Sequence, residues 1–229
     1  MTAILQVSAL ALLIALSPAV SSAWFDETHL AIAKAAGYHN WYNAAAADIA
    51  KEKMGNTEGY NHYVENVKGT IVTSEMVLAQ MSQYDTLSYG HLYGAIMAAV
   101  GNYQSAKSLN AYPENHMAYA AHYLGDLSQP LRHIPMPKGG YNDRLNSKTD
   151  GIIDSEVLSN IIKIQVYDIK ISSREDLAGE IARIANLSLE LAFKLEAEDR
   201  LITKEEAYTQ LGHSASLLKA ILAYTGAAN

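Results

Sequence analysis

Titratable side chains are concentrated in one short stretch, HMAYAAHYLGDLSQPLRH, which ends at His133 and holds three of the eight histidines of the chain. Within it, His122 and Asp126 are four residues apart, so in a helix they lie one turn apart on the same face. An imidazole and a carboxylate placed in this way can bind one cation together, although such a pair can also be a plain hydrogen bond on a helix surface. Pro130 must end the helix, and His133 follows in the turn.

Two further groups of potential metal ligands stand earlier in the chain. Trp24 and His29 are five residues apart, and Asp48 precedes His62 by fourteen residues. The chain has no cysteine, so a metal site would have to use histidine, carboxylate or backbone atoms. The remaining histidines have no partner at ligand spacing, and we interpret them as packing or surface residues.

The first 23 residues have the pattern of a secretory signal peptide. An uncharged apolar run, ILQVSALALLIAL, is followed by Pro18 and by small residues at Ser21 and Ala23. A membrane anchor is the alternative, but a spanning helix needs roughly 20 apolar residues and this run is shorter. We therefore expect cleavage before Trp24, a secreted or periplasmic location, and one mature domain over residues 24–229.

The charge balance limits the classes of partner. With 17 basic and 24 acidic residues, the formal net charge is −7, which argues against a stable nucleic-acid complex built on lysine and arginine. A negative net charge is compatible with bound cations. We expect a monomer.

Helical periodicity dominates the mature chain and predicts a compact all-α domain with several helices. Helices are expected from 28 to 38 with Asp26 as N-cap, from 41 to 53, from Ser74 onward, over 90–107, and from Asn115 to Ser128. Loops are expected over 56–69 and 134–150. Three further helices are expected over 151–166, 173–198 and 204–224, the last with a capping box formed by Thr203 and Glu206.

The motifs SSAWFDETH and HYLGDLSQPL and the Asp48–His62 pair resemble the superfamily of zinc-dependent phospholipases C and single-strand-specific zinc nucleases. The resemblance runs from residue 24 to about residue 154, while the C-terminal helices match only in character. It implies an α-helical fold of the zinc-dependent phospholipase C type whose mature chain starts at a tryptophan that binds zinc through its free amine and carbonyl.

Carried over residue by residue, the resemblance implies three zinc sites. The first would be held by Asp48, His62, His122 and Asp126. The second would be held by the Trp24 amine and carbonyl, His29 and Asp126, so that Asp126 bridges two ions.

The third zinc site departs from the family pattern. Where the family has histidine two residues after the proline, this chain has Arg132, with His133 one residue later. Where the family has a histidine and an acidic residue four apart, this chain has Asn146 and Asp150. His133 and Asp150 are the candidate ligands. Asn146 is a poor zinc ligand, because a neutral oxygen binds zinc more weakly than an imidazole nitrogen does.

The resemblance implies a zinc-dependent phosphodiester hydrolase in which Asp48 orients or deprotonates the attacking water. A phospholipase C that acts on phospholipid head groups, with peripheral membrane contact, is the first expectation. A single-strand-specific nuclease and 3′-nucleotidase is the alternative. A catalytically degenerate secreted zinc-binding protein is the non-enzymatic alternative, motivated by Arg132 and Asn146. Tyr60 and Tyr63 flank His62 and are candidates for substrate contact.

Overall fold

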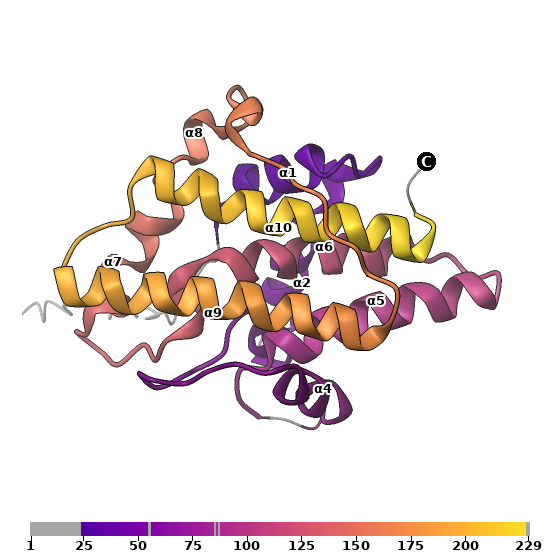
Figure 1. The fold of residues 1–229 in the computed structure, drawn as a ribbon, viewed down its shortest axis with the longest axis horizontal. Helices are drawn as coiled ribbons and strands as arrows, with labels where there is room; N and C mark the ends of the chain where they lie inside the picture. The colour runs from indigo at the N-terminus through magenta and orange to yellow at the C-terminus, as the bar shows by residue number, and fades with distance from the viewer. Residues whose placement is uncertain (1–23, 55, 85, 87, 228–229) are drawn as a thin grey trace, which may run out of the picture.

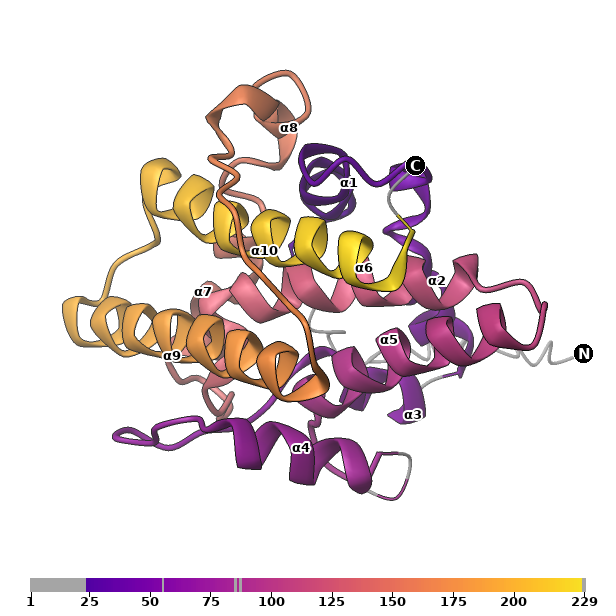
Figure 2. The same ribbon diagram turned by 45° about the vertical axis from the view of Figure 1, so that its right-hand side comes forward.

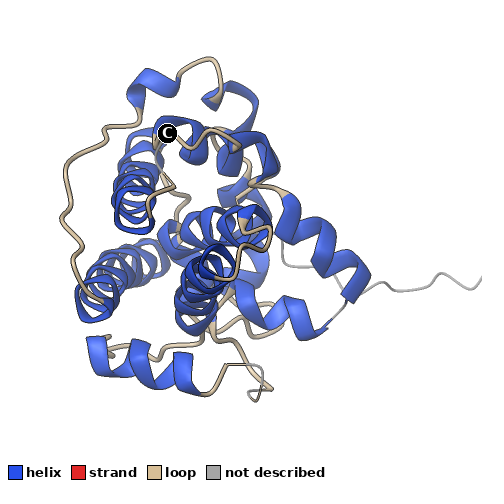
Figure 3. Cartoon of the chain, turned by 90° about the vertical axis from the view of Figure 1, so that its right-hand side faces the viewer, coloured by secondary structure: helices blue, strands red, loops and turns tan. Residues whose placement is uncertain are grey.

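The chain folds into helices joined by loops. The computed structural model describes residues 24–54, 56–84, 86 and 88–227. Within these ranges it contains α-helices and short 3-10 helices and no strand (Figure 3), so the predicted all-α single domain is confirmed. The predicted signal peptide, residues 1–23, lies outside the described residues. In the described part of the chain no helix is long and apolar enough to cross a membrane.

The α-helices are labelled α and the 3-10 helices η in chain order (Figure 1). They are α1 (Asp26–Ala35), η1 (Trp41–Asn43), α2 (Ala46–Met54), α3 (Asn56–Gly59), η2 (Tyr60–His62), α4 (Ser74–Ser82), α5 (Leu92–Ser108), α6 (Glu114–Ser128), η3 (Pro130–His133), α7 (Tyr141–Asp150), α8 (Asp154–Val157), η4 (Ile161–Lys163), α9 (Arg174–Glu198) and α10 (Lys204–Thr225).

Helix α6 lies in the middle of the molecule. It contacts α1, α2, α5, α9 and α10 (Figures 1 and 2), and every residue from Ala120 to Ser128 is buried. A helix that is buried on all sides must satisfy its polar side chains inside the protein, because an unpaired buried polar group is costly. His122 and Asp126, both on this segment, therefore need partners in the interior.

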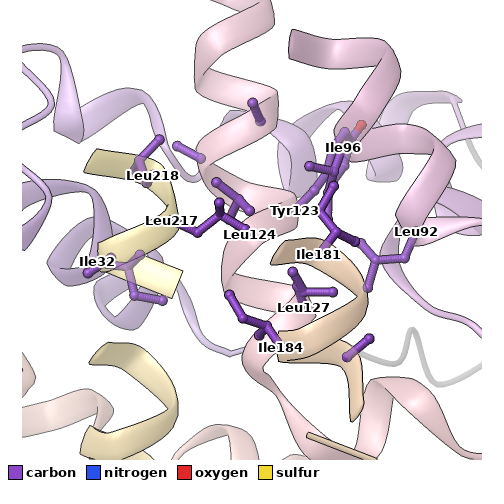
Figure 4. Packing of buried hydrophobic residues seen from close by; sticks show 14 of the residues in the cluster. Ile32, Leu92, Ile96, Tyr123, Leu124, Leu127, Ile181, Ile184, Leu217 and Leu218 are labelled. Atoms are coloured by element: carbon purple, nitrogen blue, oxygen red, sulfur yellow. The ribbon is translucent and has the colours of Figure 1, made fainter. Parts of the chain in front are cut away.

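Aliphatic side chains of two long helices, α9 and α10, hold α6 in place. Figure 4 shows Leu124 of α6 beside Leu217 of α10, and Leu127 of α6 beside Ile181 and Ile184 of α9. All five side chains are fully buried. Burial of each such side chain contributes about 1.5–3 kcal/mol. The polar residues of α6 are thus carried on a backbone that tertiary packing fixes.

The predicted starts of the last two long helices are confirmed, whereas that of the first is wrong. Ser173 caps α9 by accepting a hydrogen bond from the Asp176 amide, and Thr203 forms the predicted capping box at the start of α10. Helix α1 begins at Asp26, and Phe25 is its N-cap. The Asp26 carboxylate stands in the first turn, where the helix dipole favours negative charge.

Four predicted segments differ from the structure. The expected loop over 134–150 contains α7, whose buried side chains are mostly polar, so hydrophobic periodicity did not reveal it. The expected helix over 151–166 is reduced to the short α8 and η4. The expected loop over 56–69 begins with the helical turns α3 and η2, and the expected helix over 41–53 is divided into η1 and α2.

Candidate metal centre

The central helix α6 presents His122 and Asp126 one turn apart, and both side chains are fully buried. The His122 Nδ1–H donates to the carbonyl oxygen of Ala44 over 2.8 Å, which leaves the lone pair on Nε2. That Nε2 lies 3.5 Å from Asp126 Oδ2 and 3.8 Å from Asp48 Oδ1. It has no hydrogen-bond partner among the described residues, so it is oriented to bind a cation.

The short helical turn η2 brings His62 to the same place. His62 Nδ1 lies 2.9 Å from Asp126 Oδ2 and 3.9 Å from Asp48 Oδ1. The backbone beside it is anchored, because the Val64 amide donates to the Arg132 carbonyl over 2.9 Å. The predicted association of Asp48, His62, His122 and Asp126 is therefore present in the structure.

Helix α1 adds His29, whose ring stacks on that of His122 with centroids 3.8 Å apart and planes at 10°. His29 is fully buried, and neither of its ring nitrogens has a hydrogen-bond partner in the described part of the chain. The close approach depends on Gly125 of α6, where a Cβ atom would lie 2.3 Å from His29 Nδ1. A buried imidazole left without partners costs free energy, which a bound metal ion would offset.

These five side chains form two overlapping sets of potential ligands, and together we call them the His/Asp cluster. Ligand atoms of His29, Asp48 and His122 lie within 4.8 Å of one another, as do those of His62, His122 and Asp126. The grouping differs from the one that the resemblance implies, because His29 associates with Asp48 and His122. The cluster nevertheless contains five of the eight predicted metal ligands.

The charges of the His/Asp cluster favour a cation. Burial lowers the pKa of His29 to about 3 and also lowers the pKa of His122, so both rings are neutral at neutral pH. Burial alone would raise the pKa of Asp126 and of Asp48. The neighbouring His122 and His62 hold the pKa of Asp126 below its usual range, and His122 together with the Lys51 ammonium, 2.7 Å from Asp48 Oδ1, does the same for Asp48. Burial alone would lower the pKa of His62, but Asp126 raises it above the usual value.

The donor atoms of the His/Asp cluster suit zinc. Three imidazoles and two carboxylates, without a thiolate, match the nitrogen and oxygen ligands that zinc accepts in catalytic sites. The unpartnered Nε2 of His122 and both unpartnered nitrogens of His29 would gain a ligand when an ion binds. The described residues therefore fit one or two zinc ions.

Trp24 lies two residues before the start of α1 and is fully buried. Its predicted ligation through a free amine depends on cleavage of the chain before this residue. That ligation stays a prediction.

The structure does not bring His133 into the His/Asp cluster. Its Nε2–H donates to the carbonyl oxygen of Leu127 over 2.8 Å, and its Nδ1 lies 3.0 Å from the Tyr93 hydroxyl. Burial lowers its pKa to about 4. With both nitrogens hydrogen-bonded, His133 is a structural residue here, and its predicted metal ligation has no geometric support.

Asp150 and Asn146 lie on α7, and both contact Gln129. The Gln129 amide donates to Asp150 Oδ1 over 2.5 Å and to Asn146 Oδ1 over 3.3 Å. Burial raises the pKa of Asp150 to about 8, although Arg132 and the hydrogen bond from Gln129 lower it. The other oxygen, Oδ2, faces Arg132 at 4.0 Å. The predicted third site is thus filled with protein contacts.

Glu58 was missed in the sequence. Its Oε1 lies 3.7 Å from His62 Nε2, on the side of the ring away from Asp126. Glu58 is buried and is held by hydrogen bonds from the Tyr123 hydroxyl and, over 3.0 Å, from Asn61 Nδ2. A carboxylate behind a metal-binding histidine fixes its orientation and makes it a stronger ligand. The signal was present, because Glu58 and His62 are four residues apart in helical turns.

Tyr60 and Tyr63 flank His62, as the sequence requires, and both are half-buried. Their ring centroids are 6.5 Å apart. Their contact with substrate stays a prediction.

Comparison with protein-family models and with curated proteins finds no match for this chain. The functional argument therefore depends on the geometry of the His/Asp cluster.

Proposed function

We propose that the protein is a zinc-dependent phosphodiester hydrolase. The observation that carries the proposal is the inner face of the His/Asp cluster, where an unpartnered nitrogen of His29 and one of His122 lie within 4.8 Å of an Asp48 oxygen. Buried polar atoms are nearly always hydrogen-bonded in proteins. Two unpartnered imidazole nitrogens beside a carboxylate oxygen are the arrangement that a metal ion completes, and the Asp48 carboxylate also pairs with Lys51 Nζ over 2.7 Å.

His29, Asp48, His62, His122 and Asp126 would hold the metal. Bound zinc supplies Lewis-acid polarisation of a phosphoryl oxygen and lowers the pKa of water that it binds. The side chain of Asp48 is 18% exposed, whereas those of His62, His122 and Asp126 are at most 1% exposed. Asp48 is therefore the cluster member that solvent and substrate can reach, and its lowered pKa suits it to orienting a water molecule.

Phospholipid head groups are the first proposed substrates, and single-stranded nucleic acid is the second. The proposal includes removal of residues 1–23, a secreted or periplasmic location and a second zinc ligand set at the Trp24 amine. The resemblance of the motifs around Trp24, Asp48 and His122 supports these parts.

The test uses protein processed to start at Trp24 and loaded with zinc. Three substrates separate the alternatives: bis(p-nitrophenyl) phosphate as an activated diester, phosphatidylcholine vesicles and single-stranded DNA. Variant His122→Asn keeps a side-chain donor for the Ala44 carbonyl but lacks the nitrogen that faces the cluster. His116→Asn, on the same helix and outside the cluster, is the matched control.

We expect hydrolysis of the activated diester by the wild type and by His116→Asn, and a loss of at least about 100-fold in His122→Asn, because one catalytic metal ligand is missing. Release of phosphocholine identifies the phospholipase, and release of nucleotides identifies the nuclease. Zinc bound without turnover of the activated diester would overturn the enzymatic proposal and favour the non-catalytic zinc-binding protein.

A further inference from the structure

A buried guanidinium lies beside the His/Asp cluster, between two buried carboxylates. Arg132 Nε is 3.8 Å from Asp126 Oδ1, and Arg132 Nη2 is 4.0 Å from Asp150 Oδ2. The Arg132 side chain is 3% exposed, and both carboxylates are fully buried. Neither of these two oxygens has a hydrogen-bond partner among the described residues. Arg132 therefore places a fixed positive charge within 4.0 Å of both of them.

Each of the two carboxylates divides its oxygens between different partners. Asp126 directs Oδ2 to His62 and His122 in the cluster and directs Oδ1 to Arg132. Asp150 accepts a hydrogen bond from Gln129 on Oδ1 and directs Oδ2 to Arg132. Asp126 thus faces the cluster with one oxygen only, whereas the two oxygens of Asp150 face Gln129 and Arg132.

The backbone holds Arg132 in this position from both sides. Its amide donates to Gln129 Oε1 over 3.2 Å, and its carbonyl accepts from the Val64 amide over 2.9 Å. Gln129 therefore fixes both Arg132, through Oε1, and Asp150, through Nε2. These two backbone hydrogen bonds fix the Cα position of Arg132 and so limit where its guanidinium can lie.

A buried carboxylate needs a positive partner, because removing a charge from water costs several kcal/mol. A metal ion can supply that charge, but so can a guanidinium, which remains protonated at any ordinary pH. The space between Asp126 and Asp150 already contains one such fixed charge. A metal ion added there would lie next to a like charge.

We propose that Arg132 is a built-in cation that takes the place of a metal ion between Asp126 and Asp150, so that metal binding is confined to the His/Asp cluster. Asp150 is then a positioning residue for Arg132 and not a metal ligand. Arg132 acts through Asp126, whose outer oxygen it neutralises while the inner oxygen faces the cluster. This inference extends the proposed function, because it assumes that the cluster binds metal.

The first test counts zinc in gel-filtered protein by elemental analysis at pH 8.5, above the pKa of about 8 to which burial raises Asp150. The variants are Asp150→Asn, Arg132→His and the double variant. Asp150→Asn should keep the zinc content of the wild type. Arg132→His should gain one zinc ion, and the double variant should lose it again. A zinc ion lost in Asp150→Asn, or no gain in Arg132→His, overturns the proposal.

The second test measures thermal unfolding of the metal-free protein, also at pH 8.5 so that Asp150 is ionised, and needs no bound metal. Arg132→Met leaves two buried carboxylates without their cation, so its midpoint should fall by about 10 °C. Adding Asp150→Asn to Arg132→Met should recover about half of that loss, whereas Asp150→Asn added to the wild type should lower the midpoint. Additive effects in the two backgrounds would show that Arg132 and Asp150 are not coupled and would overturn the proposal.

The two failures can be told apart. If the wild type retains no zinc, the proposed metal-dependent function fails, while the thermal unfolding data still decide whether Arg132 is the counterion of Asp126 and Asp150. If the wild type retains zinc and Asp150→Asn releases part of it, only the role assigned to Arg132 fails.

Discussion

Gly125 allows the sharpest test of the His/Asp cluster, because it is the point where α6 and His29 meet. A Cβ atom at this position would lie 2.3 Å from His29 Nδ1 and 2.6 Å from His29 Cε1, whereas ordinary van der Waals contacts begin at 3.4 Å. In the variant Gly125→Ala the imidazole must therefore move by about 1 Å. Metal–ligand distances tolerate only about 0.2 Å, so His29 can no longer bind in the same geometry.

The stability of Gly125→Ala should change little in comparison. Replacing glycine by alanine within a helix gains about 1 kcal/mol, while overpacking a buried site costs about 1–3 kcal/mol. The net loss is then at most about 2 kcal/mol, and the protein stays folded. Zinc affinity should fall by about 10–100-fold or more, the range that follows when a ligand is misoriented.

Titration of the metal-free protein against a chromophoric zinc chelator measures this loss, and urea unfolding measures stability on the same samples. The matched control is Gly101→Ala on α5, where an added Cβ meets no atom within 4 Å in the described part of the chain. It should keep the zinc affinity of the wild type and gain up to about 1 kcal/mol in stability. Zinc affinity unchanged in Gly125→Ala would refute the assignment of His29 as a ligand.

Three further results are expected. Glu58→Gln should weaken zinc binding by about 10–100-fold, because His62 loses the carboxylate that orients it, whereas the exposed control Glu75→Gln should bind zinc like the wild type. Equal zinc affinities of Glu58→Gln and the wild type by calorimetry would contradict this role of Glu58. Because Asp126 raises the pKa of His62, zinc binding should displace the proton of His62. The zinc affinity should therefore fall about tenfold per pH unit below that pKa. Calorimetry in two buffers of different ionisation enthalpy should detect release of one proton. Burial lowers the pKa of His29 to about 3 and that of His133 to about 4. As pH falls from 6.5 to 4, the unfolded state therefore takes up protons that the folded state does not, and each histidine should remove about 1.4 kcal/mol of metal-free stability per pH unit. Urea unfolding of His133→Asn should show a shallower pH dependence than that of the wild type.

Part of the candidate site follows from the sequence because it lies on one continuous helix. His122 and Asp126 share a helix face at four-residue spacing, and Pro130 ends the helix as its missing amide requires. The motif resemblance also identified Asp48 and His62, which the fold brings within 4 Å of His122 and Asp126. Local geometry and a distinctive motif were sufficient for these four residues.

The surroundings of the site could not be predicted in the same way. His133 stands at a plausible spacing, but the turn η3 directs its ring to the Leu127 carbonyl and the Tyr93 hydroxyl. Spacing along a turn does not specify which way a side chain points. Helix α7 was missed because its buried face carries Asn142, Asn146 and Asp150, and hydrophobic periodicity detects only apolar faces.

The arrangement of hydrogen bonds distinguishes a metal centre from an ordinary buried polar network. Among the outer atoms, His122 Nδ1 donates to the Ala44 carbonyl, while His62 Nε2 lies 3.7 Å from Glu58 Oε1 and Asp126 Oδ1 lies 3.8 Å from Arg132 Nε. Among the inner atoms, His62 Nδ1 and Asp126 Oδ2 are hydrogen-bonded over 2.9 Å. Within each of the two ligand sets, the ligand atoms lie within 4.8 Å of one another.

A network built for stability alone would also pair the inner nitrogens of His29 and His122, because each unpaired buried group costs free energy. Here the Nε2 of His122 and both nitrogens of His29 lack hydrogen bonds in the part of the chain that the structure describes, although His29 is firmly held between the His122 ring and Gly125. Side chains whose outer contacts fix their direction while their inner lone pairs stay available are what a cation site requires. The fold thus accepts an unfavourable arrangement in the metal-free state, and a bound ion accounts for it.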